Sequence, residues 1–504
     1  MKLSLSMIVK NEERSLPGCL ESVNGLVDEI VIVDTGSTDS TKKIAERHGA
    51  RIFDFEWCND FSAARNESLK NCTGDWVLYL DADERIDKTF HGTIRGLISS
   101  GKADAYLLNL KSKIGTSADS QYHLVAYPRL FKRMKGLKFV GKVHEQITTS
   151  LSVLRARIVQ TDVIIDHLGY AQNDDVIREK ARRNYELLLD QIEKRVNYGY
   201  ALYQLGQTEI VLGEVGKGLQ HLNDALAAGG FGKSVRASIY TIIAENKFKQ
   251  GNSEEALAAC DKSLEFAERQ TFAHMLKADI YSKLGEYGKS EEAYLKAAEQ
   301  YRISILKGKV ATAIEPVFDE YVLYSKVGKA ASLAGDVETA KIYLAKAAEA
   351  KPSPERTAAY IEVLLKNGMY HDAADAAKQF KEFENEDWYL RLVSSALIEI
   401  GDFQGASVML EKISEHDKVS WSSFANCRLK LGDFEGAESA FQHAIESGYD
   451  DPQGLELFGL AQFRLGKFSE AVETLTKVVQ INPQNIRAEK FIKAAKGQLL
   501  VVGS

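Results

Sequence analysis

Two carboxylates, Asp81 and Asp83, follow directly after the apolar run Trp76–Leu80. That run has the length and composition of a strand buried on both faces, and open α/β sheets bind ligands beyond the carboxyl ends of such strands. Two carboxylates at this spacing can face one cation, directly or through water. A hard ion such as Mg²⁺ or Mn²⁺ would bridge them to a diphosphate and neutralise charge on a leaving group. The alternative is a solvated acidic turn or a helix cap.

The elements that must position these carboxylates alternate between strands and helices in the N-terminal third of the chain. Apolar runs predict strands at 3–9, 29–34, 50–55, 76–80, 105–110 and 126–131. Helical patterns through Val23, over 40–48 and over 61–71 separate the first four runs. This order predicts an α/β domain with a mostly parallel central sheet.

From about Tyr198 the predicted strands cease and a repeat begins. Glycines recur at separations of 34, 50, 33, 33, 31 and 34 residues, at Gly251, Gly285, Gly335, Gly368, Gly401, Gly432 and Gly466. The residue five positions after each glycine is small, and the residue seven before it is small in all but one case, which lets two antiparallel helices approach closely. The pattern resembles tetratricopeptide repeats, whose period is near 34 residues. The gap of 50 residues predicts an insertion of about 16 residues near 301–316.

Composition sets wider limits on the function. A chain of 504 residues is too long for one ordinary core, so two or more domains are expected. The net charge of −7 gives no reason to propose nucleic acid as a partner. Five scattered cysteines without a CxxC pair suggest neither a disulfide framework nor a zinc site. The N-terminal apolar run is too short for a signal peptide and no run is long enough to span a membrane, so no integral membrane segment and a cytoplasmic location are expected.

Four ordered motifs narrow the chemistry. The segments Ile8–Glu13, Ile32–Asp39, Ala64–Asn66 and Leu80–Asp83 resemble, in order and spacing, the family 2 glycosyltransferases of the GT-A fold. The resemblance implies inverting transfer of a sugar from a nucleotide donor. It implies a Rossmann-like α/β GT-A domain over 1–170, a helical linker over 171–198 and an all-α tetratricopeptide-repeat solenoid over 199–504.

The resemblance also implies a nucleotide-sugar pocket formed by Ile8, Val9, Lys10, Glu12, Asp34, Arg65, Asp81, Ala82, Asp83 and His144. Asp34 would bind the base or ribose, since a carboxylate that ends a buried strand needs a partner. Its alternative role is a cap for the following helix. Arg65 would reach the base or the phosphates, because a guanidinium offers a fork of donors to oxyanions. Its alternative is an ion pair with Asp81.

Two further segments, GKVHE ending at Glu145 and HxGY at His167–Tyr170, precede a KxRRN run and resemble a narrower group, the SunS-like peptide glycosyltransferases with fused repeats. The resemblance implies Glu145 as the catalytic base, Asp83 and His167 as ligands of Mn²⁺ or Mg²⁺, and His144 as a residue that shapes the site. A thiol acceptor would need less help from a base than a hydroxyl. The basic residues between Arg129 and Lys142 are predicted to lie on a solvated loop, with a phosphate-steering edge as the alternative.

The resemblance implies a UDP-hexose or UDP-N-acetylhexosamine donor and a protein or peptide acceptor, bacteriocin-like or flagellin-like, modified on Ser/Thr or Cys. The repeats would recruit that acceptor along a concave groove, although a scaffold or dimerisation element is an equal interpretation. A homodimer is compatible with the resemblance. Two other functions stay open at this point: transfer to a cell-envelope glycan or lipid-linked acceptor, and an interaction scaffold with a non-catalytic transferase domain.

Overall fold

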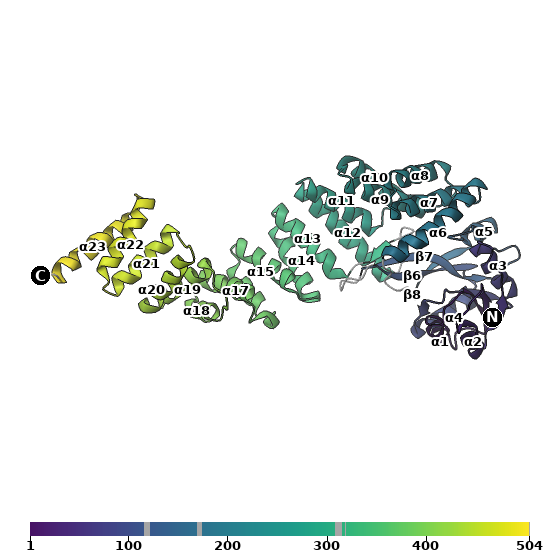
Figure 1. The fold of residues 1–504 in the computed structure, drawn as a ribbon, viewed down its shortest axis with the longest axis horizontal. Helices are drawn as coiled ribbons and strands as arrows, with labels where there is room; N and C mark the ends of the chain where they lie inside the picture. The colour runs from purple at the N-terminus through teal and green to yellow at the C-terminus, as the bar shows by residue number, and fades with distance from the viewer. Residues whose placement is uncertain (115–120, 169–173, 308–314, 318, 503–504) are drawn as a thin grey trace. The chain divides into compact units, whose positions relative to one another are not determined.

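The computed structural model describes residues 1–114, 121–168, 174–307, 315–317 and 319–502 (Figure 1). Its contacts separate two compact units, Met1–Leu323 and Tyr324–Ser504, which are described here one at a time. Gly169 and Tyr170 of the predicted HxGY motif lie outside the described residues. None of the described helices has the length and apolar character needed to cross a bilayer.

The first half of the sheet is parallel, as the apolar runs predict. It consists of β1 (Leu3–Val9), β2 (Glu29–Asp34), β3 (Arg51–Asp54) and β4 (Trp76–Tyr79), in the spatial order β3-β2-β1-β4. Val9 pairs with Asp34 at the carboxyl ends of β1 and β2, and β4 lies parallel to β1 on its other side. The loops after these parallel strands therefore meet at one edge of the sheet.

The second half of the sheet has both parallel and antiparallel pairs, and two of its strands, β5 (Glu84–Ile86) and β8 (Ile158–His167), were not predicted from the sequence. β7 (Gln121–Lys132) is antiparallel to β4 and to β6 (Ala105–Ile114), and β8 is parallel to β6. The short β5 completes the order by pairing antiparallel with β8. This pairing sets Glu84 opposite His167, so residues far apart in the chain meet beside the acidic motif.

Helices cover both faces of the sheet. The helices are α1 (Leu16–Ser22), α2 (Thr41–Arg47), α3 (Phe61–Asn71), α4 (His91–Ser99) and α5 (Thr148–Val153). Leu5 and Met7 of β1 pack with Leu20 of α1 and Ile94 of α4 in one core. Residues of the opposite face, among them Val77, pack with residues of α3 and α5 in a second core. The predicted α/β domain of GT-A type is confirmed.

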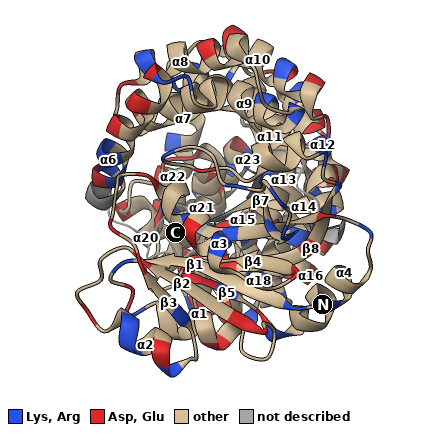
Figure 2. Ribbon diagram, turned by 90° about the vertical axis from the view of Figure 1, so that its right-hand side faces the viewer, with Lys and Arg blue, Asp and Glu red and all other residues tan. Residues whose placement is uncertain are grey.

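Helical hairpins follow and confirm the predicted solenoid. After α6 (Asp174–Glu193) the helices are α7 (Tyr198–Val211), α8 (Val215–Ala228), α9 (Lys233–Lys249), α10 (Ser253–Phe266), α11 (Thr271–Lys283), α12 (Tyr287–Lys307), α13 (Glu320–Ala334), α14 (Val337–Ala350), α15 (Pro354–Lys366), α16 (Tyr370–Ala377), α17 (Asp387–Glu399), α18 (Phe403–Glu411), α19 (Lys418–Lys430), α20 (Phe434–Glu446), α21 (Pro452–Arg464), α22 (Phe468–Ile481) and α23 (Ile486–Val502). In the first unit, helices α6–α12 arch over the sheet, with basic and acidic residues interspersed along them (Figure 2).

The small residues at fixed offsets are where the paired helices touch. Ala340 and Ala437 are fully buried, and a Cβ added at Gly328 would lie 2.6 Å from Cγ of Leu344. The turn glycines adopt positive φ, for example 83° at Gly432. Residues that carry a side chain rarely adopt this conformation. The small residues at these offsets therefore allow the paired helices to pack closely.

One expectation for this region is wrong. A strand, β9 (Glu315–Val317), follows α12 at the end of the predicted insertion and pairs antiparallel with β7 of the sheet. Three residues that include a proline are too short to show an alternating pattern, and β9 forms because it can add to an existing strand. The repeat region thus contributes a strand to the sheet.

Overpacking one of these contacts tests the role of the small residues. Ala437→Leu should destabilise the chain by about 1–3 kcal/mol, because the extra methylenes have no space between α19 and α20. Ser439→Leu, at an exposed position of the same helix, should change stability by less than about 0.5 kcal/mol. Urea unfolding followed by circular dichroism measures both. Equal stability of the two variants would contradict the close-packing explanation.

Candidate active site

The two carboxylates of the acidic motif turn toward different partners. Asp81 Oδ1 accepts a hydrogen bond from Arg65 Nη2 at 2.8 Å, whereas Asp83 Oδ2 lies 3.0 Å from His167 Nε2. Burial alone would raise the pKa of Asp81, but the neighbouring Arg65 and Arg129 outweigh it and lower the pKa to about 2. Asp81 is therefore ionised and committed to the protein, while Asp83 faces the cavity with His167.

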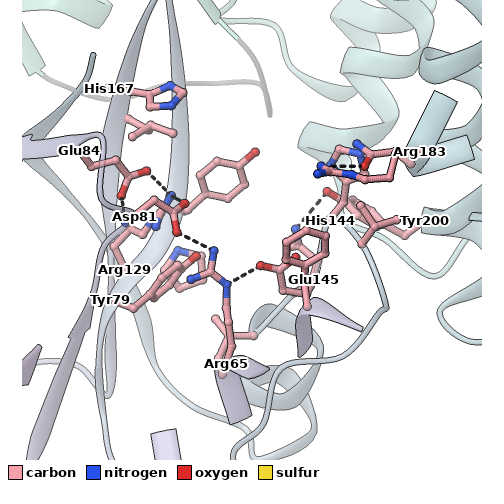
Figure 3. A pocket seen from close by; sticks show the side chains of 18 residues that line it. Arg65, Tyr79, Asp81, Glu84, Arg129, His144, Glu145, His167, Arg183 and Tyr200 are labelled. Atoms are coloured by element: carbon pink, nitrogen blue, oxygen red, sulfur yellow. Dashed lines mark hydrogen bonds and ion pairs between the residues drawn. The ribbon is translucent and has the colours of Figure 1, made fainter. Parts of the chain in front are cut away.

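Arg65 joins the acidic motif to the segment that carries Glu145. It projects from α3, is buried, and donates through Nε to Glu145 Oε1 as well as to Asp81 (Figure 3). Its guanidinium also lies 5.1 Å from the centroid of the Tyr79 ring. The ion pair with Asp81, one of the two roles considered for Arg65, is thus present, and the same side chain lines the cavity that would hold a ligand.

Asp34 takes the capping role considered for it and leaves one carboxylate oxygen unpaired within the described part of the chain. Its Oδ1 accepts from the backbone N–H groups of Gly36 at 3.0 Å and Ser37 at 2.8 Å, so it caps the turn that leads to α2. Its Oδ2 is buried and has no hydrogen-bond partner among the described residues. A buried carboxylate oxygen without a donor is unfavourable, so this atom is suited to a hydroxyl or N–H of a ligand.

Two adjoining cavities contain almost all of the predicted site residues. The first, of about 550 Å³, is lined by Ile8, Val9, Lys10, Glu12, Thr35, Trp57, Phe61, Arg65, Asp81, Ala82, Asp83, His167, Lys180 and Arg183. The second, of about 320 Å³, contains His144 and Glu145 in its wall. The cavities share Phe61, Arg65, Asp81, His167 and Arg183, and Asp34 is buried at the strand end next to Thr35. Glu12 lines the first cavity together with the acidic motif, and burial and then the charge of Asp83 raise its pKa.

The sequence did not predict the pair formed by Glu84 and Arg129. Arg129 Nη2 donates to Glu84 Oε1 at 2.7 Å, and the other oxygen of Glu84 accepts from the backbone N–H of Asp81 at 2.9 Å. Burial raises the pKa of Glu84 to about 7. Glu84 therefore fixes the backbone of the acidic motif by accepting the hydrogen bond from the Asp81 N–H.

The prediction that Arg129 belongs to a solvated loop is wrong. It lies on β7, its side chain is 6% exposed, and its guanidinium lies 4.2 Å from the centroid of the Tyr79 ring. The physical reason is the antiparallel pairing of β7 with β4, which places this cation inside the sheet domain beside an acidic partner. The sequence shows a basic run that contains Arg129, and it shows Glu84. Nothing in the sequence indicates that these two side chains meet.

The donor set suits a divalent ion that shares its ligands with a diphosphate. Among the described residues no group of three or more His, Cys, Asp or Glu side chains converges as a metal site. Asp83 and His167 do converge, and Ser112 Oγ lies 3.0 Å from His167 Nδ1, which orients the imidazole ring. The hydrogen bond with Asp83 raises the pKa of His167. Mg²⁺ typically takes one or two carboxylates and completes its shell with phosphate oxygens and water, so Asp83 fits this ion. The imidazole of His167, once neutral, fits a borderline ion such as Mn²⁺ better than Mg²⁺.

A GT-A-type sheet that ends in this acidic motif, beside a cavity of nucleotide size, defines a glycosyltransferase. Comparison with known proteins agrees: residues 4–160 match the family described as glycosyl transferase family 2, and residues 273–302 and 424–486 match tetratricopeptide repeats. Residues 4–160 therefore form a glycosyl transferase family 2 domain, and tetratricopeptide repeats follow it in the same chain.

Individual relatives support both parts. The chain is 29% identical to a TPR repeat-containing protein of Synechococcus elongatus over 58% of its length and 74% of that protein. It is 31% identical to the SPbeta prophage-derived glycosyltransferase SunS of Bacillus subtilis over 37% of its length and 44% of SunS. It is 35% identical to an uncharacterized glycosyltransferase of Rickettsia felis over 21% of its length, and it spans 37% of that protein. A solved tetratricopeptide repeat protein from Parabacteroides merdae is 16% identical over 52% of this chain and 98% of its own, with a TM-score of 0.31, too low to support an argument.

A double-mutant cycle tests the pair beneath the motif. Arg129→Met and Glu84→Gln should each destabilise the chain by about 3 kcal/mol. The first leaves the buried Glu84 without its cation, and the second leaves Arg129 without its counter-charge and offers one acceptor oxygen to two donors. The double variant should be more stable than the sum of the two effects predicts. Scanning calorimetry measures the melting temperatures of the four proteins: the unaltered full chain, the two single variants and the double variant. Strict additivity would show that the two side chains are not coupled.

Proposed function

We propose that the chain transfers a hexose or N-acetylhexosamine from a UDP-sugar to a Ser, Thr or Cys side chain of a protein or peptide, with inversion at the anomeric carbon. The observation that supports this best is the arrangement of the two cavities on either side of Arg65 and Asp81. The larger cavity reaches from Lys10 to Asp83 and suits the nucleotide and its diphosphate. The smaller one contains Glu145 and suits the sugar and the acceptor.

The residues of the larger cavity would bind and orient the donor. The free oxygen of Asp34 would accept a hydrogen bond from the base or the ribose, and Asp83 with His167 would hold Mg²⁺ or Mn²⁺ on the diphosphate. An ion bound there would supply positive charge to the departing nucleoside diphosphate. Lys180 and Arg183, which project from α6 into the same cavity, would add charge-assisted hydrogen bonds to phosphate oxygens.

Glu145 would act on the acceptor. Its Oε1 is held by Arg65, and no described residue donates to Oε2, so this oxygen can take the proton of the acceptor O–H or S–H. The acceptor atom forms a bond to the anomeric carbon while the bond from that carbon to the diphosphate oxygen breaks. The electron pair of the broken bond leaves with the nucleoside diphosphate. Attack opposite the leaving group inverts the configuration.

The repeats would recruit the acceptor, since tetratricopeptide repeats are protein-interaction modules. A screen of UDP-sugars with Mn²⁺ or Mg²⁺, read as released UDP, combined with the intact mass of candidate peptides, tests the whole proposal. A mass gain of one hexose or N-acetylhexosamine is expected. Turnover only with lipid-linked or glycan acceptors would replace the protein acceptor, and absence of any turnover would favour a non-catalytic scaffold.

Removing the proposed metal ligand should remove the reaction. Asp83→Asn should lower kcat/KM for the donor by at least about 100-fold, because the ion that neutralises the leaving group is lost, and a chelator should do the same to the unaltered protein. Asp87→Asn, an exposed position four residues on, should keep full activity. Released UDP measures all three. Full activity of Asp83→Asn would exclude the metal role of Asp83.

Removing the proposed base should affect transfer more than donor binding. Glu145→Gln keeps an acceptor for Arg65 but cannot take a proton, so kcat with a hydroxyl acceptor should fall by about 10²- to 10⁴-fold. The affinity for UDP, measured by calorimetry, should stay within about twofold of its original value. The exposed Glu179→Gln on α6 is the control and should leave both quantities unchanged. A loss of affinity as large as the loss of kcat would contradict a role in proton transfer.

A further inference from the structure

The segment 139–147, here called the Glu145 loop, is closed on itself by its own backbone. Val140 and Gln146 exchange two hydrogen bonds, of 3.0 and 2.9 Å, so the residues between them form a small closed turn. Within it His144 has a φ of 51°, a left-handed conformation that costs about 1 kcal/mol for a residue with a side chain. A short turn with this backbone needs outside contacts to keep Glu145 in one orientation.

One set of outside contacts comes from α3, the helix that carries Arg65. Asn66 exchanges two hydrogen bonds with the backbone of Phe139, of 3.0 and 2.8 Å. The backbone N–H of Phe61 donates to the carbonyl of Lys142 at 2.9 Å. This side of the Glu145 loop is thus tied to the same helix that holds the Glu145 carboxylate.

The other set comes from α6 and α7, outside the matched transferase region. Gln191 Oε1, on α6, accepts from the backbone N–H of Lys142 at 2.9 Å, and Asp190 pairs with Lys142 Nζ at 2.7 Å. Tyr200 Oη, on α7, accepts from Gln146 Nε2 at 3.1 Å and from Gln204 Nε2 at 2.9 Å. Gln191 is buried, with 3% of its surface exposed, and Tyr200 is half-buried. Desolvation raises the pKa of the Tyr200 hydroxyl.

We propose that Gln191 and Tyr200 are positioning residues for Glu145, so that α6 and the first repeat helix belong to the catalytic apparatus. They act through the Glu145 loop. Gln191 fixes the backbone of Lys142, and Tyr200 fixes the side chain of Gln146. A hydrophobic contact supports the same link, since Val143 of the loop packs with Leu188 of α6 and Leu205 of α7 in one cluster. The inference rests on the proposed role of Glu145 in transfer.

Tyr200 and Tyr203 form a matched pair for the test. Both project from α7 and their rings are 5.7 Å apart. Tyr203 is buried and Tyr200 is half-buried, and of the two Tyr200 bonds to the Glu145 loop. Tyr200→Phe removes that one hydroxyl, and Tyr203→Phe removes its neighbour. Gln191→Leu, which breaks the bond to Lys142 from α6, is the second test variant because Gln191 does not line either cavity of the site.

The experiment measures kcat of transfer, the Kd of UDP with Mn²⁺, and amide hydrogen exchange of segment 139–147 in the full chain. Tyr200→Phe and Gln191→Leu should each lower kcat about five- to tenfold, the effect of one lost hydrogen bond, while the Kd stays within about twofold. Exchange in segment 139–147 should become faster in both variants. Tyr203→Phe should match the unaltered protein in all three measurements.

Three results would overturn the inference. The first is an unchanged exchange rate in segment 139–147 in both test variants. The second is a kcat equal to that of the unaltered protein, and the third is an equal effect of Tyr203→Phe. Absence of transfer by the unaltered protein would refute the proposed function alone, because the exchange measurement still decides whether Gln191 and Tyr200 hold the Glu145 loop.

Discussion

The guanidinium of Arg65 is the interaction on which the rest of the site depends. It is a buried cation that bonds to Asp81, at the end of β4, and to Glu145, which lies 80 residues further along the chain than Arg65. A buried charge is tolerated only with such partners, so the cost of exposing Arg65 to an apolar interior keeps these three segments together. Arg129 extends this row of alternating carboxylates and guanidinium groups, because it lies between Asp81 and Glu84 and pairs with both. The row holds three carboxylates and two guanidinium groups, and Asp83 beside it adds further negative charge, which favours a bound cation at this edge.

Sequence patterns predicted the parts of the site that depend on strand ends. The apolar runs of β1, β2 and β4 are buried and parallel, and the loops after them carry the residues that line the larger cavity. The pattern did not predict β5 or β8, because β5 has only three residues and its partner β8 begins 72 residues after it ends. Without that pairing nothing in the sequence shows that Glu84 lies opposite His167, or that Arg129 is buried beside Glu84.

In the repeats, too, the sequence predicted some contacts and missed others. The small residues at fixed offsets predicted the close packing of successive helices, because that packing is local and recurs with the period. A period describes only how each repeat meets the next one. It therefore carries no information on contacts that occur once, such as Tyr200 with Gln146 or β9 with β7.

These single contacts explain why the sheet and the first repeats form one compact unit. The fold adds elements of the repeat region to two structures that carry site residues: α7 to the Glu145 loop, and β9 to β7, the strand of Arg129. A flexible tether would leave the first repeat helices free to move relative to the acidic motif. Here hydrogen bonds, a sheet ladder and an apolar cluster fix the first repeat to the walls of the smaller cavity. A protein bound by these repeats would be held at a defined distance from Glu145, which reduces the entropy lost when its side chain enters the site.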